Sequence, residues 1–583
     1  MMNFSGTRAH KFTESPVLKL RLQAWRSRLT ALLILAGFAV LIGRSFYLQV
    51  LNNDFLQEKG ESRYRRDLEI SASRGRISDR NGDVLAVSTP MQSIWAIPAD
   101  ARLTPEQTRQ LAGLLEMDIK ELERRLASDK SFVFLKRQLS PEIGEKIAAL
   151  KLPGIGQDRE YRRYYPNGEM TAHLVGFTGI DDKGLEGVEL AFQGQLLGHP
   201  GSRSVIKDRR GQIVEDVGSV RSPRDGNDIH LAIDSKIQYI AYSQLKQAVE
   251  HFKAKAGGVV VADARTGEIL ALANWPTYNP NNRERLTGAQ LRNRALTDTY
   301  EPGSVMKPFT VALALEANKV RFDTVINTAP GYLNFGKMTI SDSHRYGPLT
   351  VAQVIQKSSN VGTAKIAAML PPEKMWNMYE AIGLGQAPGL GFPGEVSGRL
   401  RSWKSWRPVE QATMSYGHGL SVSLMQLARA YTVFAREGDI IPLTLTKSDG
   451  TLARATPVFS QQTVREMRAM LEMATQPGGT APKARVPGYR IGGKTGTAYK
   501  IEGGQYVKNY VASFVGFAPI SDPRLVVAVM IDEPGFGAHF GGDVAGPVFS
   551  RVMGGALRTL GVVPDAPVVQ AAAGGARSEQ EKL

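Results

Sequence analysis

The pattern of apolar and polar positions divides the chain into three parts. Near the N-terminus, residues 29–43 form an uncharged apolar run, LTALLILAGFAVLIG. In residues 51–220, short apolar runs such as SIWAIP alternate with helical patterns such as TPEQTRQLAGLLE, and no long sheet pattern or repeat is visible. Residues 221–228, RSPRDGND, are rich in turn formers and predict a hinge and a domain boundary.

The part beyond this hinge is more apolar and predicts helices packed on a mainly antiparallel sheet. GGVVVADARTGEILALAN predicts two strands around an Arg-Thr-Gly turn. Helical patterns follow, among them VMKPFTVALALEANK and SLMQLARAYTVFA, and YVASFVGFAPI and RLVVAVMIDEP then return to strand patterns. Strands at both ends of a region with helices between them indicate an α+β fold whose sheet joins distant parts of the sequence.

The apolar run at residues 29–43 predicts a membrane anchor. It is short for a hydrocarbon core of about 30 Å, but an extension through Arg44 to Val50 gives about 22 residues. Residues 1–28 hold six Lys or Arg residues and one Glu, which by the positive-inside tendency places them in the cytoplasm. A signal-peptide core and a buried soluble helix are the alternatives. Because no clear small-x-small cleavage site follows, we expect an uncleaved anchor with the bulk of the chain outside the cytoplasm.

Composition narrows the chemistry further. The chain has 583 residues, which is enough for two or three domains, and it has no cysteine. Thiol catalysis, thiolate metal sites and disulfides are therefore excluded. The eight histidines show no metal-ligand spacing. The net charge of +16 is compatible with a nucleic acid, a membrane surface or an acidic polymer, and part of it belongs to the basic segment before the anchor.

One stretch, GYRIGGKTGTAYK at residues 488–500, supports two functions. Gly488, Gly493, Lys494 and Thr495 match the phosphate-binding loop GxxxxGK[ST], whereas Lys494 to Gly496 match the KTG of serine acyl-transfer enzymes. A phosphate loop follows a buried strand and opens a helix. Here a proline-containing cationic segment precedes the match and a hairpin pattern follows it, so we reject the nucleotide interpretation.

A serine-lysine pair gives the second element of an acyl-transfer site. SxxK occurs three times, and only the copy Ser304/Lys307, in TYEPGSVMKPFT, begins an apolar helical pattern after a Pro-Gly turn. This places Ser304 at a helix N-terminus, where backbone N–H groups favour developing negative charge. Lys307 lies on the same helix face. A desolvated lysine beside other cations loses its proton readily and can act as a base toward the hydroxyl.

Two further motifs follow in order along the chain, and their residue types fit the same chemistry. The only SxN that we find is Ser358-Ser359-Asn360, and the only KTG begins at Lys494. Singly, Asn360 could end a helix and Lys494 could be a surface cation. Taken together with Ser304/Lys307, they predict that Ser304 attacks an amide carbonyl, that Lys307 takes its proton, and that Ser358 relays it to the leaving amine, with Asn360 and Lys494 orienting and polarising the relay.

The residues after Lys494 predict how substrate is held. Gly496 allows a substrate backbone to approach the strand closely. The hydroxyls of Thr495 and Thr497 can hold a substrate carboxylate. The oxyanion formed by the attack requires two backbone donors near the nucleophile.

The motifs resemble the penicilloyl-serine transferases, and in particular the class B penicillin-binding proteins of the septal type. RGRISDRNGDVLAVS, RRYYPNGEMTAHLVGFTGIDDKGLEGVEL and KDRRG are similar to the non-catalytic motifs of that family. RNRALTDTYEPGSVMKPF, KSSNVG, SYGHGLSVSLMQLARAY and GGKTGTA are similar to its catalytic motifs. The resemblance extends from the anchor to about residue 555.

The resemblance implies a fold and a domain layout. The expected fold is α+β: a transpeptidase domain with helices on a mainly antiparallel sheet, behind an elongated mixed α/β pedestal and one N-terminal transmembrane helix. The expected segments are a cytoplasmic basic tail (1–28), a transmembrane signal anchor (29–50), a pedestal domain of the dimerisation type (51–224), a transpeptidase domain (225–563) and a disordered tail (564–583).

The resemblance also implies an activity, partners and a location. The substrate would be the D-alanyl-D-alanine end of a peptidoglycan stem peptide, acylating Ser304, and β-lactams would acylate the same serine. The oxyanion donors would be the N–H groups of Ser304 and Thr497. No metal or organic cofactor and no nucleic acid are expected. The expected partners are the SEDS glycosyltransferase FtsW and other divisome proteins, and the expected location is the inner membrane with the catalytic domain in the periplasm.

Four alternatives remain to be weighed against the septal transpeptidase. A bifunctional class A protein would carry a glycosyltransferase motif before the transpeptidase domain, and residues 51–220 have none. A β-lactamase would need a deacylating water with its base, and would lack this pedestal and anchor. An elongation-specific class B enzyme shares the three catalytic motifs. A penicillin sensor or non-catalytic divisome scaffold would bind without turnover, against which Lys307, Asn360 and Lys494 argue.

Overall fold

The computed structural model describes the chain except for residues 1–23, 52–64, 208–212, 337, 451–452 and 568–583. The chain divides into two compact units: Met1–Ile70 with Pro200–Pro223, and Ser71–His199 with Arg224–Leu583. Residues 71–199 and 224–583 fall in the same unit, so the domain boundary predicted at residues 221–228 stays a prediction. Most of the predicted basic tail and of the predicted disordered tail lies outside the described residues.

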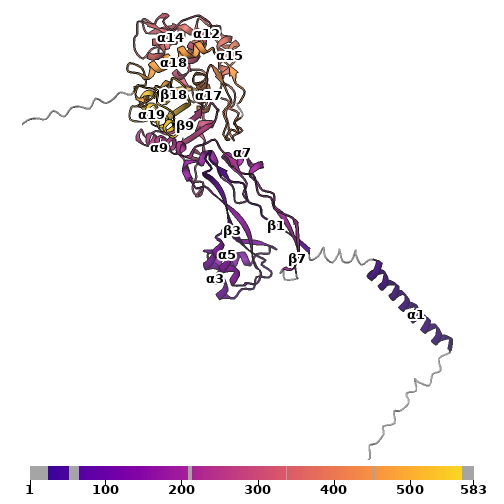
Figure 1. Cartoon of the computed structure of the whole chain (residues 1–583). Coiled ribbons are helices and arrows are strands. Elements are labelled where there is room, and N and C mark those ends of the chain that lie inside the picture. The colour runs from indigo at the N-terminus through magenta and orange to yellow at the C-terminus, as the bar shows by residue number, and fades with distance from the viewer. Residues whose placement is uncertain (1–23, 52–64, 208–212, 337, 451–452, 568–583) are drawn as a thin grey trace, which may run out of the picture. The chain divides into compact units, whose positions relative to one another are not determined.

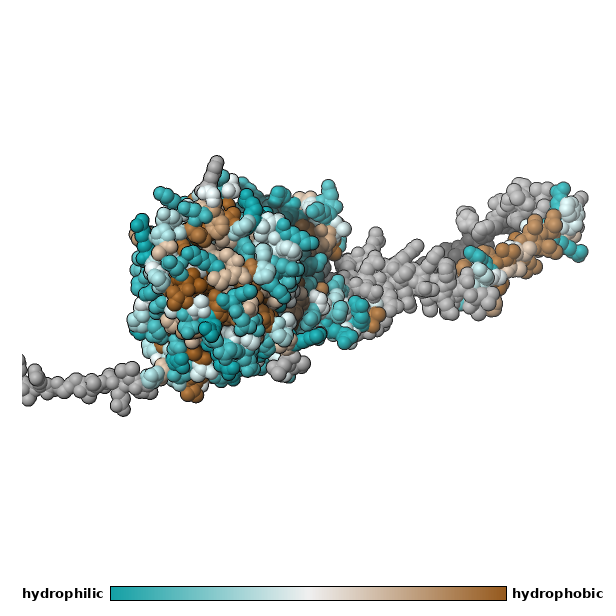
Figure 2. Space-filling view, turned by 90° about the horizontal axis from the view of Figure 1, so that it is seen from above, coloured by the Kyte–Doolittle hydropathy of each residue, from teal (hydrophilic) through white to brown (hydrophobic). Residues whose placement is uncertain are grey.

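The first unit contains the predicted anchor and a small sheet. Helix α1 (Ala24–Phe46) continues into a π-helical turn, η2 (Tyr47–Leu51), and none of the α1 residues is buried. Residues 24–49 form the one helix in the described chain that is long and apolar enough to cross a membrane. Figure 2 shows its nearly continuous band of hydrophobic side chains with hydrophilic ends. Strands β1 (Arg65–Ile70), β6 (Gly201–Lys207) and β7 (Ile213–Arg221) form an antiparallel sheet in that order.

The second unit begins with a region that we call the pedestal, residues 71–199, built on long strands. Strand β3 (Val84–Ala96) pairs with β4 (Val133–Leu139), with β2 (Ile77–Ser78), and with β5 (Ile155–Tyr164) over ten positions. The expectation of no long sheet here was wrong. Both faces of β3 and β5 are partly exposed, and β5 (IGQDREYRRY) is mostly charged, so the apolar alternation that predicts strands is absent.

Short helices complete the pedestal. Three of them, at residues 105–115, 119–126 and 141–149, pack their apolar faces on β3 and β4 in a small core that includes Ile94, Leu111, Leu122 and Ile147. Figure 1 shows α3 and α5 at one end of the long strand β3. The helical elements are α3 (Pro105–Leu115), α4 (Ile119–Leu126), α5 (Pro141–Ala149), η3 (Gly168–Met170), α6 (Ala172–Val175), α7 (Gly187–Ala191) and α8 (Gln193–Leu196).

A buried ion cluster fixes the inner end of the pedestal. The guanidinium Nε atoms of Arg74 and Arg163 each lie 2.6 Å from a different carboxylate oxygen of Glu189, and all three side chains are almost fully buried. Arg163 also donates to the carbonyl of Gly75 at 2.7 Å. Because the two cations share one anion and bond to backbone carbonyls, this cluster holds the RGRI segment against α7.

The turn after β2 connects the pedestal to the catalytic region. The buried carboxylate of Asp79 accepts from the N–H of Asn81, and at 3.1 Å from that of Ser235. Ser235 is the first residue of α9 (Ser235–His251), which Asp234 caps. Strand β8 (Ile229–His230) pairs in parallel with β2. The pedestal turn therefore contributes directly to the start of a catalytic-region helix.

The catalytic region is built around a five-stranded antiparallel sheet in the order β10-β9-β19-β18-β17. Its strands are β9 (Ala256–Asp263), β10 (Ile269–Trp275), β17 (Gly492–Glu502), β18 (Gln505–Ala518) and β19 (Leu525–Asp532). The predicted union of first and last strands is confirmed, because β9 pairs with β19. Gly503 and Gly504, both with positive φ, make the predicted turn between β17 and β18.

Helices cover both faces of this sheet. Val259 and Val261 of β9 face a core with α9 and α19 (Gly541–Thr559), whereas Val260 and Ala262 face a larger core with α17 (Leu424–Ala435). The larger core also contains α12 (Lys307–Glu316), α13 (Val351–Lys357), α14 (Asn360–Ala367), α15 (Pro372–Ala381) and α18 (Gln461–Thr475). Figure 1 shows α12, α14, α15 and α18 gathered at one end of the region.

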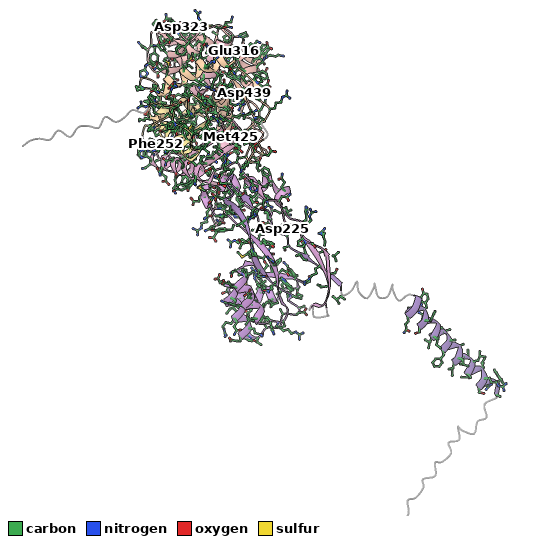
Figure 3. The ribbon with its side chains drawn as sticks, viewed as in Figure 1. Asp225, Phe252, Glu316, Asp323, Met425 and Asp439 are labelled. Atoms are coloured by element: carbon green, nitrogen blue, oxygen red, sulfur yellow. The ribbon has the colours of Figure 1, made fainter. Side chains whose placement is uncertain are left out.

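Glu316 joins two of these helices. It ends α12 and accepts hydrogen bonds from Ser460 and Thr463 at the start of α18. Figure 3 labels Glu316 within the catalytic region. The remaining elements are α10 (Gly288–Leu291), α11 (Arg294–Thr297), η4 (Gly303–Met306), β11 (Val325–Asn327), β12 (Tyr332–Phe335), β13 (Met338–Ser341), β14 (Pro348–Thr350), η5 (Trp403–Ser405), α16 (Pro408–Met414), β15 (Asp439–Ile440), β16 (Thr456–Pro457) and η6 (Pro482–Ala484).

Candidate active site

Ser304 lies in the tight helical turn η4, immediately before α12, as the Pro-Gly pattern predicts. Gly303 has φ of 62°, and its N–H donates to the carbonyl of Gly417 at 3.1 Å. Val305 and Met306 are fully buried, and Tyr431 donates to the carbonyl of Val305 at 2.7 Å. The residues before and after Ser304 are therefore held in place by these contacts, and they fix the turn that carries the serine.

Lys307 lies directly beneath this turn and contacts the SxN motif. Its Nζ atom lies 2.6 Å from the carbonyl oxygen of Ser358 and 3.0 Å from the Ser358 hydroxyl. Burial and the neighbouring Lys494 ammonium lower the pKa of Lys307 well below its ordinary value, while Asp342 opposes them. A lysine whose pKa is lowered in this way loses its proton more readily, and the resulting neutral amine can accept a proton from a hydroxyl.

The SxN motif spans the junction of two helices. Ser358 ends α13 in the left-handed conformation, with φ of 59°, and α14 begins at Asn360. The Ser359 hydroxyl accepts from the N–H of Gly362 at 2.8 Å and caps α14, and the Asn360 amide donates to the carbonyl of Ser341 at 2.9 Å. This abrupt change of direction places the Ser358 hydroxyl over Lys307.

The KTG motif forms the free edge of the sheet, since β17 is the last strand in the order. Lys494 is fully buried, and its Nζ atom lies 3.1 Å from the Thr495 hydroxyl; burial lowers the pKa of Lys494 to about 7. The Thr495 hydroxyl donates to that of Thr480, and the Thr497 hydroxyl accepts from the N–H of Gly541. The strand runs on to Glu502 with no helix after Lys494, in agreement with the rejection of the phosphate-loop interpretation.

Gly496 is required by the nucleophile turn as well as by a substrate. A Cβ atom at this position would lie 2.7 Å from the carbonyl oxygen of Pro302 and 2.3 Å from the Ser513 hydroxyl. These distances are shorter than van der Waals contact, so only glycine allows β17 to lie against the turn that carries Ser304. The sequence interpretation considered only the approach of a substrate.

A cavity of about 610 Å³ brings the predicted residues together. Ser304, Ser358, Asn360, Thr495 and Thr497 line it, while Lys307 and Lys494 are fully buried behind its wall. The sequence interpretation missed the rest of the lining: Ser343, His344, Tyr346, Lys357, Gly478, Gly479, Thr480, Phe540, Gly541, Gly542 and Asp543.

Apart from Lys357, which ends α13, the missed residues come from loops and from the start of α19. Phe540 immediately precedes α19, and Gly541 and Gly542 open its first turn. A 19-residue helix carries a partial positive charge at this end, so the cavity favours an anion here. The glycine pair before the apolar pattern VAGPVF was the available signal for a helix start at a site.

The other SxxK copies lie elsewhere in the fold. Ser243 lies within α9 and donates to the carbonyl of Ile240, and Ser204 lies in β6. In the described part of the chain, no group of three or more His, Asp or Glu side chains is placed to hold a metal ion.

Comparison with known proteins gives the family. Residues 257–554 match the penicillin binding protein transpeptidase domain, and residues 69–231 match the penicillin-binding protein dimerisation domain. The chain is 46% identical over 541 residues to the probable peptidoglycan D,D-transpeptidase PenA of Neisseria gonorrhoeae, covering 92% of this chain and 93% of the relative. It is 42% identical over 551 residues to the peptidoglycan D,D-transpeptidase FtsI of Escherichia coli strain K12, covering 93% of each.

Solved structures agree with these relatives. The transpeptidase domain of Burkholderia pseudomallei penicillin-binding protein 3 is 55% identical and covers 58% of this chain and 98% of that chain, with a TM-score of 0.54. A peptidoglycan synthetase from Bifidobacterium adolescentis is 26% identical and covers 86% of this chain and 98% of that chain, with a TM-score of 0.70. The chain therefore belongs to the class B penicillin-binding proteins. Its activity is that of a peptidoglycan D,D-transpeptidase.

Proposed function

We propose that this transpeptidase crosslinks stem peptides at the division septum through an acyl-enzyme on Ser304. The observation that carries the acyl-enzyme is the contact between the buried Lys307 amine and the Ser358 hydroxyl, 3.0 Å apart, at the wall of the cavity that Ser304 lines. This contact joins a base of lowered pKa to a hydroxyl that can pass a proton onward.

In the acylation step, the Ser304 hydroxyl oxygen attacks the carbonyl carbon of the penultimate D-alanine. Lys307 takes the hydroxyl proton as the new C–O bond forms. The C–N bond to the terminal D-alanine then breaks, and the Ser358 hydroxyl delivers a proton to the leaving nitrogen while it regains one from Lys307. The N–H groups of Ser304 and Thr497 stabilise the oxyanion between these events.

The terminal carboxylate is held at the other end of the cavity. The hydroxyls of Thr495 and Thr497 line that end together with the start of α19, so hydroxyl donors and the helix dipole act on one anion. Lys494 and Asn360 orient and polarise the Ser358 hydroxyl. In the second step, the amine of a neighbouring stem attacks the ester carbonyl, gives its proton to the same relay and releases the Ser304 hydroxyl.

The proposal extends to the organisation of the whole chain. Residues 1–28 would form a cytoplasmic tail, 29–50 the anchor, 51–224 the pedestal, 225–563 the transpeptidase domain and 564–583 a disordered tail. The anchor would place the catalytic domain in the periplasm, and the proposed partners are FtsW and other divisome proteins. The apolar helix α1 and the similarity to proteins named FtsI support these assignments.

Intact-mass analysis after incubation with penicillin tests the nucleophile. The full chain in detergent should gain one covalent adduct that the Ser304→Ala variant lacks. Ser243→Ala, which removes the serine of another SxxK copy, is the matched control and should keep the adduct. An adduct that persists in Ser304→Ala would show that the nucleophile is wrongly assigned.

Two further measurements separate the remaining functions. Turnover of a stem-peptide thioester with an added acceptor amine distinguishes an enzyme from a scaffold, because a scaffold binds penicillin without making crosslinks. Depletion of the protein in growing cells distinguishes septal from elongation roles: filaments indicate a septal enzyme, and rounded cells indicate an elongation-specific one.

A further inference from the structure

Two buried hydroxyl groups behind the nucleophile turn take no part in the proposed reaction. Thr310 lies on α12, three residues after Lys307, and Tyr379 lies on α15. Both side chains are fully buried, and their hydroxyl oxygens lie 3.2 Å apart. A hydroxyl that is buried without a hydrogen-bond partner is costly, so the partners of these two indicate what they do.

Both hydroxyls donate to one short stretch of backbone. The Tyr379 hydroxyl donates to the carbonyl of Met414 at 3.0 Å, and the Thr310 hydroxyl donates to that of Ser415 at 3.0 Å. Met414 ends α16, and residues 415–419, SYGHG, follow it as a loop that we call the SYGHG loop. Burial raises the pKa of Tyr379, so its hydroxyl keeps its proton and its bond well above neutral pH. Two helices therefore hold the start of the SYGHG loop through side-chain hydroxyls.

The SYGHG loop lies directly against the nucleophile turn. The N–H of Gly303 donates to the carbonyl of Gly417 at 3.1 Å. Gly417 has φ of 86°, and a Cβ atom there would lie 2.2 Å from the carbonyl oxygen of Gly303. This contact leaves no room for a side chain, so the loop backbone touches both the N–H and the carbonyl of Gly303. The placement of Gly303 therefore depends on the placement of the loop.

The orientation of the Gly303 carbonyl determines that of an oxyanion donor. The carbonyl of Gly303 and the N–H of Ser304 belong to one planar peptide unit, so a rotation of this unit turns both groups together. The Ser304 N–H is one of the two proposed oxyanion donors, and such a donor is effective only at about 2.7–3.1 Å from the developing charge. After the serine, Tyr431 holds the carbonyl of Val305. The peptide unit before the serine is the one that the SYGHG loop contacts.

We propose that Thr310 and Tyr379 are positioning residues that, through the SYGHG loop, orient the Ser304 N–H toward the oxyanion. This inference rests on the proposed function. Within the described chain neither residue lines the catalytic cavity, so they act without touching the substrate. Each hydroxyl supports one of two successive carbonyls. Loss of either lets the loop, and with it the Gly303 peptide unit, move away from the orientation that the reaction needs.

Variants that remove one hydroxyl each test this role. Thr310→Val and Tyr379→Phe leave the shape of the side chain almost unchanged. Stopped-flow acylation of the full chain in detergent by a chromogenic cephalosporin separates the dissociation constant of the first complex from the acylation rate constant. We expect each variant to lower the rate constant about tenfold and to keep the dissociation constant within about twofold, because complete loss of an oxyanion donor costs about 10²–10³. Thr310→Ser keeps the hydroxyl and should recover most of the wild-type rate.

The ester carbonyl of the acyl-enzyme reports the orientation of the donor directly. Infrared difference spectra are recorded with penicillin that carries ¹³C at the reacting carbonyl. Because a hydrogen bond from the Ser304 N–H lowers the stretching frequency of this carbonyl, its band should move to higher wavenumber in Thr310→Val and Tyr379→Phe. The band should stay in place in Thr310→Ser.

A matched control separates this role from the general cost of removing a buried hydroxyl. Thr432 is also fully buried, but its hydroxyl donates to the carbonyl of Arg429 in its own helix. Thr432→Val should therefore keep the wild-type rate constant and band. A fraction of protein that fails to fold lowers the amplitude of the acylation trace and leaves its rate constant unchanged. If one of the two test variants does not fold at all, the other carries the test.

The outcomes distinguish this inference from the proposed function. Wild-type rate constants in Thr310→Val and Tyr379→Phe overturn the positioning role. A slower rate with an unmoved carbonyl band, or an equal loss in Thr310→Ser, also overturns it, because the side chains then act through packing alone. All these results leave the acyl-enzyme on Ser304 intact. An adduct that survives Ser304→Ala overturns the proposed function and the positioning role with it.

Discussion

The carboxylate of Asp342 lies 2.7 Å from the hydroxyl of Ser359 and 3.0 Å from the N–H of Val361. Asp342 directly follows β13, and Ser359 is the N-cap residue of α14. The Asp342 side chain therefore connects the β12–β13 hairpin to the SxN motif. It also opposes the fall in the pKa of Lys307. Asp342 thus acts on the SxN motif and on Lys307 without lining the catalytic cavity.

Replacing Asp342 should change both the rate of acylation and its pH dependence. In Asp342→Asn, loss of the charge-assisted bonds should slow acylation by penicillin about tenfold. Removing an anion also lowers the pKa of Lys307 further, so the acid limb of the rate profile should move to lower pH. Stopped-flow acylation between pH 4 and 10 measures both effects. Asp323→Asn is the control; a slower rate with an unmoved acid limb would contradict the electrostatic link between Asp342 and Lys307.

The two buried lysines predict a bell-shaped dependence of acylation on pH. The proposed relay needs Lys307 neutral and Lys494 charged, and burial lowers the pKa of both. Acylation should rise with pH as Lys307 loses its proton, and fall again with an apparent pKa of about 7 as Lys494 loses its own.

A charge-preserving variant checks the assignment of the alkaline limb. Lys494→Arg keeps its charge at any pH used, so the fall near neutral pH should disappear even if the maximal rate is lower. The second-order rate constant for acylation, followed across pH by intact mass, is the measurement. An alkaline limb that stays in place in this variant would assign it to another group.

Gly496→Ala should disable the enzyme while the protein still folds. The added Cβ would meet the carbonyl oxygen of Pro302 at 2.7 Å, and a backbone atom on the nucleophile turn cannot rotate away. A shift of a few tenths of an ångström to an ångström should reduce acylation about a hundredfold. Gly347→Ala, where no atom lies within 4 Å of the new Cβ, is the control and should acylate at the wild-type rate.

The buried cluster of the pedestal should dominate the stability of that region. Glu189→Gln leaves Arg74 and Arg163 buried without their anion, and we expect a loss of about 3–5 kcal/mol in the free energy of unfolding, measured in urea. Asp228→Asn breaks the exposed pair with Arg76 and should cost less than about 1 kcal/mol. Equal losses in the two variants would show that the Glu189 cluster is not the main determinant of pedestal stability.

The sequence contains strong signals for the catalytic sheet and weak ones for the pedestal. Strands β9 and β19 are buried on both faces and appear as continuous apolar runs, so their existence and type are predictable. Strand β5 is half exposed and charged, and its pairing with β3 depends on tertiary contacts that no local pattern encodes.

The site residues also fall into two groups: some are predictable from sequence motifs, and others depend on tertiary packing. Ser304, Ser358 and Lys494 belong to motifs with a chemical reason for their spacing, and their meeting follows from the predicted order of elements. The full burial of Lys307 and Lys494, which sets their proton affinities, depends on packing from several helices. Residues 540–543 line the cavity only because α19 lies beside β17. No sequence motif predicts that position of α19.

The pairing of β9 with β19 has a consequence for the folding of the chain during its synthesis. Ribosomal synthesis makes β9 early and the nucleophile turn soon afterwards, but β17, β18 and β19 come near the end of the chain. Until β19 pairs with β9, the central strand of the sheet is missing. Strand β17, which lies against the turn that carries Ser304, is then not in place either. Nascent and prematurely terminated chains therefore lack the β17 side of the cavity that Ser304 lines, and this cavity is complete only when the whole domain has closed.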